Sequence, residues 1–111
     1  MKRTSIYELK GKGKLNFLDA TFNIGPLLRG GLHFYKPGEK SHAKEERHVH
    51  PDHYEVFVNV QGRGTLEIEG REYAFNVGDI FLIEPVESHH LTADEGFPVV
   101  NLWMAAEKKL G

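Results

Sequence analysis

Two histidines separated by a single residue are the first feature of this sequence that could do chemistry. His48 and His50 belong to the segment 48–55, which reads HVHPDHYE. In an extended chain, side chains two residues apart point to the same side, so these imidazoles project together at a spacing of about 6.5–7 Å. Imidazole nitrogens at this spacing can converge on one metal ion, at roughly 2.0–2.1 Å each. The pair therefore predicts a metal site.

A carboxylate and a further imidazole would complete such a site. Pro51 allows the chain to turn, so the segment 54–60 can return as a neighbouring strand with Glu55 near its start. His89 and His90 follow Pro85 in a later predicted strand, and neighbours in a strand point to opposite faces, so only one of them can enter the interior. Three neutral imidazoles and one carboxylate suit one divalent transition metal ion: Mn, Fe, Co, Ni, Cu or Zn.

The elements that must position these residues are short strands. Turn signals such as Gly25-Pro26, Pro37-Gly38 and Gly78-Asp79 divide the chain into pieces rich in β-branched and aromatic residues. We predict a hairpin that turns at 69–71, a charged loop at 39–47 and a short helical turn or frayed tail at 105–110. This pattern is typical of an all-β sandwich or barrel. The predicted strands are 15–22, 27–35, 54–60, 65–69, 72–75, 80–83, 89–92 and 98–104.

Composition excludes several classes of function. The 111 residues suffice for one domain, 1–111, and the 14 basic and 16 acidic residues offer no cationic surface for nucleic acid. The chain has no cysteine, which excludes disulfides, thiolate metal sites and cysteine nucleophiles. Its apolar runs are far shorter than the roughly 20 residues of a membrane helix, and the first ten residues lack the apolar stretch of a signal peptide. We therefore predict a cytoplasmic protein that contacts neither membrane nor nucleic acid.

The histidine segment resembles the first motif of the cupin superfamily, Gly-(x)5-His-x-His-(x)3–4-Glu-(x)6-Gly. His48, His50, Glu55 and Gly62 satisfy this motif from the first histidine onward. The opening glycine is missing, because His42 occupies its position. The resemblance implies a small single-domain cupin, which is an all-β jelly-roll β-barrel, also called a double-stranded β-helix.

Residues 78–94 resemble the second cupin motif, Gly-(x)5-Pro-x-Gly-(x)2-His-(x)3-Asn, less closely. Six residues instead of five separate Gly78 from Pro85, Glu87 replaces the glycine, and Asp94 replaces the asparagine. Counting from Pro85 puts His90 at the histidine position, with His89 as its alternative. The two motifs together cover residues 48–94. The resemblance implies the metal ligands, which are His48, His50, Glu55 and His90.

The remaining polar and aromatic candidates have plainer interpretations beside the functional ones. His53 is expected to decorate a turn or to support the ligands, His42 to be solvated, and His33 to point outward or to line a pocket. Asn59, on the face of Glu55, is expected to bind either a ligand or a buried backbone group. Trp103, Phe57 and Phe81 are expected in the core.

The segment 54–60 carries apolar groups on both faces. Tyr54, Val56, Val58 and Val60 share the face opposite Glu55. A small barrel covers only its inner face by itself, so the valines must pack against something else. We expect either a second subunit in a two-fold homodimer or the N-terminal segment of the same chain.

Three functions suit this reading, and a family resemblance alone does not choose among them. The first is a mononuclear metalloenzyme that acts on a small polar organic molecule, of dioxygenase, isomerase or decarboxylase type. The second is a non-catalytic module that binds a small ligand or a metal for sensing or storage. The third is a scaffold whose site is unused.

Overall fold

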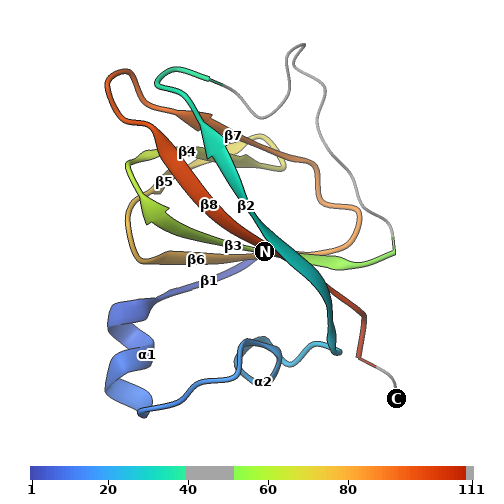
Figure 1. Cartoon of the computed structure of the whole chain (residues 1–111). Helices are drawn as coiled ribbons and strands as arrows, with labels where there is room; N and C mark the ends of the chain where they lie inside the picture. The colour runs from blue at the N-terminus through green and yellow to red at the C-terminus, as the bar shows by residue number, and fades with distance from the viewer. Residues whose placement is uncertain (40–51, 110–111) are drawn as a thin grey trace.

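Ten elements account for most of the chain in the computed structural model, which describes residues 1–39 and 52–109 (Figure 1). The described part of the chain has eight strands in two sheets and two short helices. Their bounds, in chain order, are β1 Lys2–Ser5, α1 Ile6–Lys12, α2 Leu18–Phe22, β2 Leu27–Tyr35, β3 Tyr54–Gln61, β4 Gly64–Ile68, β5 Arg71–Phe75, β6 Asp79–Ile83, β7 His89–Ala93 and β8 Val99–Ala106.

The two sheets enclose one apolar interior. The larger sheet has the order β1-β6-β3-β8-β2, and the smaller has the order β5-β4-β7. All pairings given for these strands are antiparallel. Alternate residues of both sheets meet in a core that includes Phe57, Leu66, Phe75, Phe81 and Leu91. This is the all-β barrel that the sequence predicted, and Phe57 and Phe81 lie in its core as expected.

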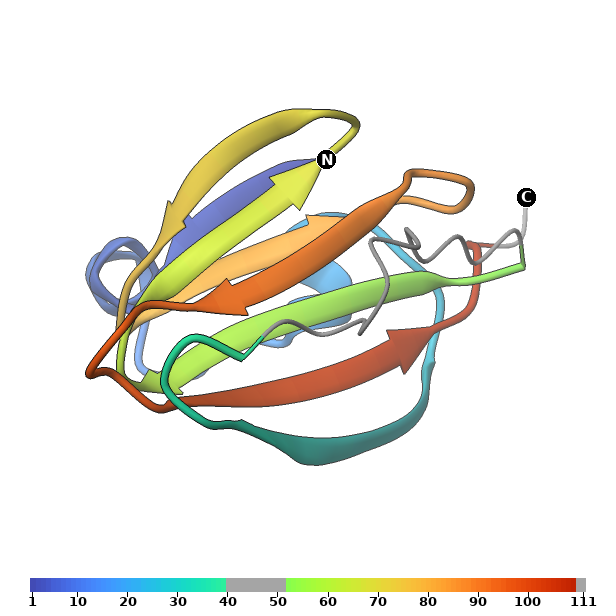
Figure 2. The ribbon, with the colours of Figure 1, turned by 90° about the horizontal axis from the view of Figure 1, so that it is seen from above.

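The opposite face of β3 is covered by the N-terminal segment of the same chain. Val56 and Val58 are buried in a second apolar cluster with Leu9, Phe22 and Ile24. Figures 1 and 2 show α1 and α2 on one side of the larger sheet. Of the two alternatives for this valine face, coverage by the same chain is therefore confirmed.

Two sequence predictions fail in the N-terminal region. The predicted strand 15–22 is wrong, because residues Leu18–Phe22 form α2, which ends at Asn23 in the left-handed conformation (φ 56°). The sequence also gave no prediction for α1, which Ser5 caps by accepting a hydrogen bond from the backbone N–H of Glu8 at 3.2 Å. The buried side chains of the helices, Leu9 of α1 and Phe22 of α2, lie in the second cluster, and Leu18 of α2 packs against it.

Turns hold the remaining strands in register. The predicted hairpin is confirmed: β4 and β5 pair, and Glu69 and Gly70 both take positive φ, as in a two-residue turn. A side chain at Gly62 would lie 1.9 Å from the carbonyl oxygen of Pro98, so this position requires glycine. The predicted helical turn at 105–110 is wrong, because β8 continues to Ala106.

Candidate metal centre

Glu55 is a buried carboxylate in the barrel interior. It lies on β3, on the face that also carries Phe57, and it is almost fully buried. One of its oxygens, Oε2, accepts a hydrogen bond from the indole Nε1 of Trp103 on β8. Burying a carboxylate is costly unless charged or hydrogen-bonding partners compensate it. Glu55 therefore has the environment of a functional carboxylate, and Trp103 fixes the orientation of that carboxylate.

His89 is the imidazole that faces Glu55. Its Nε2 atom lies 3.5 Å from Oε1 of Glu55, and both side chains are buried. Its Nδ1 atom lies 3.2 Å from the backbone carbonyl oxygen of Glu87. A carbonyl can only accept, so Nδ1 is the donor in this contact, and Nε2 is the ring nitrogen that faces Glu55. A histidine that binds a metal through one nitrogen commonly has its other nitrogen held in this way.

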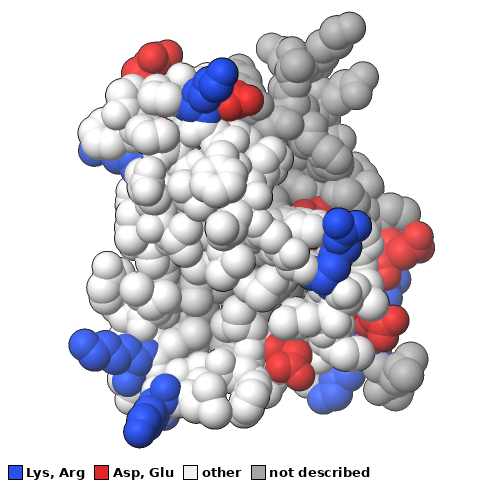
Figure 3. Space-filling model, viewed as in Figure 1, with Lys and Arg blue, Asp and Glu red and all other residues white. Residues whose placement is uncertain are grey.

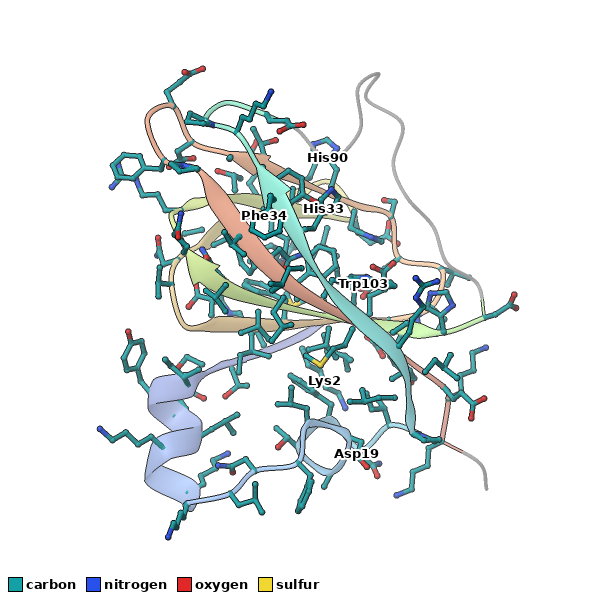
Figure 4. The ribbon with its side chains drawn as sticks, viewed as in Figure 1. Lys2, Asp19, His33, Phe34, His90 and Trp103 are labelled. Carbon is teal, nitrogen blue, oxygen red and sulfur yellow. The ribbon has the colours of Figure 1, made fainter. Side chains whose placement is uncertain are left out.

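His90 points to the other face of β7. Its Nε2 lies 3.0 Å from Oε2 of Glu67, its cross-strand neighbour on β4, and Figure 4 shows it well apart from Trp103. The choice of His90 as the inward-facing histidine is therefore wrong, and the alternative, His89, takes that position. The physical reason is the alternation of a strand: His89 and Leu91 face the core, so His90 cannot.

The turn before β7 explains why counting from Pro85 selects His90 instead of His89. Val86 takes positive φ (66°), the conformation that a glycine in this motif would supply without strain. Val86 therefore occupies the glycine position, and Glu84, which five residues separate from Gly78, occupies the proline position. Counted from Gly78, the motif histidine is His89. The sixth residue between Gly78 and Pro85 was the signal that the count from Pro85 overlooked.

The other two predicted ligands lie outside the described residues. These are His48 and His50, and His42 and the predicted loop 39–47, apart from its first residue, lie outside them as well. Within residues 1–39 and 52–109, no three metal-ligating side chains come together. Glu55 and His89 fit two positions of the predicted donor set, a carboxylate oxygen and a neutral imidazole nitrogen.

Three other polar side chains on the inner faces of β2, β3 and β8 differ in their hydrogen bonding. Asn59 is structural: its amide donates to the carbonyl oxygens of Gly62 and Phe75 at 3.0 and 2.9 Å. His33 is exposed, and its Nδ1 lies 2.9 Å from the hydroxyl of Tyr35. Asn101 is buried, and neither polar atom of its amide has a hydrogen-bond partner in the part of the chain that the structure describes. The sequence analysis overlooked Asn101, although it alternates with Val99 and Trp103 along an inward-facing row.

Comparison with known proteins agrees with this architecture. The model of the cupin domain family matches residues 31–105, so the chain belongs to the cupin family. No curated protein matches the sequence. Among described residues, no helix is long and apolar enough to cross a membrane.

Solved structures with the same fold share little sequence with this chain. A cupin protein from Bacteroides fragilis has a TM-score of 0.65 at 19% identity, covering 70% of this chain and 64% of its own. A predicted oxalate decarboxylase from Thermotoga maritima has a TM-score of 0.65 at 18% identity, covering 84% and 76%. A sugar phosphate isomerase from Silicibacter pomeroyi has a TM-score of 0.62 at 21% identity, covering 71% and 50%. The chain thus spans less than two thirds of the Bacteroides and Silicibacter proteins, and the likeness establishes the jelly-roll barrel.

Proposed function

We propose that this cupin holds one divalent transition metal ion in its barrel, with Glu55 and His89 among the ligands. The observation that supports this most is the pair itself: a buried carboxylate and a buried imidazole nitrogen 3.5 Å apart. Each is oriented by a second contact, from the indole of Trp103 or to the carbonyl of Glu87. Such supporting contacts are typical of metal ligands.

His48 and His50 would complete the ligand set, as the first motif predicts. A bound divalent ion supplies Lewis acidity: it polarises a carbonyl oxygen or lowers the pKa of a bound water. The described residues contribute orientation. Trp103 holds one oxygen of Glu55, and the carbonyl of Glu87 fixes the ring of His89, so neither ligand must reorganise when the ion binds.

We propose further that the site acts on a small polar organic molecule, as a metalloenzyme of dioxygenase, isomerase or decarboxylase type. The alternative is a module that binds a small ligand or metal without turnover. The structural relatives include proteins described as an oxalate decarboxylase and a sugar phosphate isomerase, which fits either reaction type. Product formation from a bound ligand distinguishes the enzyme from the module. The cytoplasmic location stays a prediction.

Metal analysis of neighbouring histidine variants tests the site. The wild type, His89→Gln and His90→Gln are purified without a tag, and each is titrated with Zn²⁺ against a competing chelator. We expect one ion per chain in the wild type and in His90→Gln, and a Zn²⁺ affinity about 10- to 100-fold weaker in His89→Gln. The two variants carry the same substitution on neighbouring residues of β7, His89 on the inner face and His90 on the outer face. Negligible Zn²⁺ binding by the wild type, or equal losses in both variants, would refute the proposal.

We also propose that the protein is a homodimer and that the second copy covers the outer face of β2 and β8. β2 is the edge strand of the larger sheet, and Figure 2 shows it at one side of the barrel. Its outward residues Leu32 and Phe34 are exposed, as is Val60 on β3. Figure 3 shows no charged side chain on the surface around the position at which Figure 4 labels Phe34. An uncharged apolar face beside a strand edge that no other described strand pairs suits a second copy of itself.

A further inference from the structure

Arg29 lies beside the candidate metal centre. It pairs with Ala105 on β8, and Ala105 pairs in turn with Glu55 on β3, so Arg29 and Glu55 occupy one row across the sheet. The guanidinium carbon of Arg29 lies 6.0 Å from the centre of the Trp103 ring. Because the indole of Trp103 donates to Glu55, one aromatic side chain contacts both the cation and the buried carboxylate.

The charge of Arg29 is available to a ligand. Arg29 is exposed, and no ion pair joins it to a carboxylate in residues 1–39 and 52–109. Arg63, by contrast, lies 3.3 Å from Asp94. A guanidinium presents its donors in a planar fork that matches the two oxygens of a carboxylate. Its position over the face of Trp103, 6.0 Å from the ring centre, places this fork beside the indole.

Asn101 provides a second, independent observation. Its side chain is 1% exposed, and neither its amide nitrogen nor its amide oxygen has a hydrogen-bond partner among residues 1–39 and 52–109. Such a group costs free energy unless something in the interior bonds to it. Asn59, directly opposite on β3, has backbone partners for both its amide nitrogen and its amide oxygen. Within this pair, only the amide of Asn101 still needs hydrogen-bond partners.

The two groups lie on one face of neighbouring strands. Asn101 precedes Trp103 by two residues on β8, so their side chains stand about 6.5–7 Å apart on the same side. A ligand held between a guanidinium above Trp103 and the amide of Asn101 needs roughly five to seven heavy atoms, given that spacing. It must carry a negative charge at one end and a second polar group at the other.

We propose that the barrel binds a small organic carboxylate, with Arg29 pairing its carboxylate group and Asn101 bonding its second polar group. This assignment rests on the proposed function, because it names the ligand class of the same site. The fork of a single guanidinium matches one carboxylate group, which carries one charge on two oxygens, better than a doubly charged phosphate group, which needs more than one compensating donor group. Arg29 and Asn101 are thereby residues that select the ligand.

Malonate titrations test the assignment. Malonate carries two carboxylates, and malonamide has a similar shape without charge. Both are titrated calorimetrically into the Zn²⁺-treated wild type, Arg29→Gln, Asn101→Leu and Arg71→Gln. Arg71 is an exposed arginine at the start of β5 and serves as the matched control. The Zn²⁺ content of every sample is measured in parallel.

We expect malonate to bind the wild type and Arg71→Gln equally, and Arg29→Gln about 10- to 100-fold more weakly. Malonamide should bind the wild type at least tenfold more weakly than malonate does, and Asn101→Leu should lower malonate affinity at unchanged Zn²⁺ content.

Two results would overturn the assignment: equal malonate affinity in the wild type and Arg29→Gln, or equal affinity of the wild type for malonate and malonamide. If the wild type binds Zn²⁺ but not malonate, the ligand class is refuted and the metal site is not. Malonate binding that depends on Arg29 in a protein without bound Zn²⁺ refutes the metal site and supports the ligand class.

Discussion

Tyr35 shows how strongly the barrel interior acts on a single side chain. Its hydroxyl lies 2.9 Å from Nδ1 of His33, and the centroids of the two rings lie 4.3 Å apart with their planes tilted by 34°. Burial, together with the negative charges of Glu39 and Glu55, raises the pKa of Tyr35 well above its usual range. This contact links the buried hydroxyl of Tyr35 to the exposed imidazole of His33.

Tyr35 should therefore make stability depend on alkaline pH. The unfolded chain releases the phenolic proton near pH 10, whereas the folded protein retains it, so the stabilisation is complete below about pH 10. It is lost as the pH rises further, towards the raised pKa of the folded state. Urea unfolding between pH 8 and 11 should show a shallower alkaline loss in Tyr35→Phe than in the wild type. Tyr7→Phe, at an exposed tyrosine, should follow the wild type, and identical profiles for all three proteins would contradict the account.

The sequence predicted the placement of Glu55 correctly but not which of two neighbouring histidines faces it. Spacing alone indicates a strand with Glu55 facing inward, and the structure buries that carboxylate. The choice between His89 and His90 depends on one turn residue, because a shift of one position inverts every side chain of a strand. Trp103 was expected only in the core, since no sequence pattern reveals that its indole reaches Glu55.

At the scale of elements, the turn that positions His89 carries backbone strain. Val86 is exposed and β-branched, and its φ of 66° belongs to the left-handed region that such residues rarely occupy. Strain of this kind costs on the order of 1–3 kcal/mol. The glycine of the family motif would remove it, so this chain has a stabilising substitution available at a known position.

Val86→Gly should raise the free energy of unfolding by about 1 kcal/mol, because relief of strain exceeds the added flexibility of the unfolded chain. Val77→Gly is the matched control. Val77 is also an exposed valine in a turn, but its φ is not positive, so glycine there should destabilise by about 0.5–1 kcal/mol. Urea denaturation of both variants measures the difference. Destabilisation of similar size at both positions would show that Val86 carries no strain.

The helical layer is the part of the fold that the sequence analysis missed. Residues 15–22 mix apolar and polar positions, and this pattern resembles the apolar–polar alternation of a strand. Leu18 and Phe22, four residues apart, form one helical face instead. Ser5 followed three residues later by Glu8 is a helix-start signal for α1. Segments this short have weak periodicity, so their conformation depends on the apolar sheet face that they cover.

Phe22 should contribute most to holding that layer in place. Its side chain is 4% exposed and packs in the cluster with Val56 and Val58, whereas Phe17, in the same segment, is 64% exposed. Phe22→Ala should lower the free energy of unfolding by about 3–5 kcal/mol, and Phe17→Ala by about 0.5 kcal/mol or less. Chemical denaturation with tryptophan fluorescence follows both, since Trp103 is the single tryptophan. Equal effects would mean that the helices do not pack on the sheet in solution.

For the whole molecule, the sheet face opposite the barrel interior is covered unevenly. The N-terminal helices bury the face of β3 and β6, where Val56, Ile80 and Leu82 lie. The same face continues onto β2, where Leu32 and Phe34 stay exposed. The sequence indicated that this face needs a cover. It could not indicate that one chain supplies only part of it, because that depends on how far two short helices extend across five strands.

A second copy on the exposed part should make the protein a dimer that one charge disrupts. Phe34 is 66% exposed at the centre of this surface, so Phe34→Asp would bury an unpaired carboxylate twice, once for each copy, in a two-fold interface. We expect the wild type to sediment as a dimer at micromolar concentrations and Phe34→Asp to dissociate at least about 100-fold more readily. Leu15→Asp introduces the same charge at an exposed apolar residue between α1 and α2, and it should remain dimeric. A wild type that sediments as a monomer at 100 micromolar would exclude the dimer (a concentration on the order of those at which weak specific dimers form). Dissociation of both variants alike would place the interface elsewhere. Of the two substituted residues, Phe34 alone lies on β2, a sheet edge that no other described strand pairs and that a second β2 strand can pair.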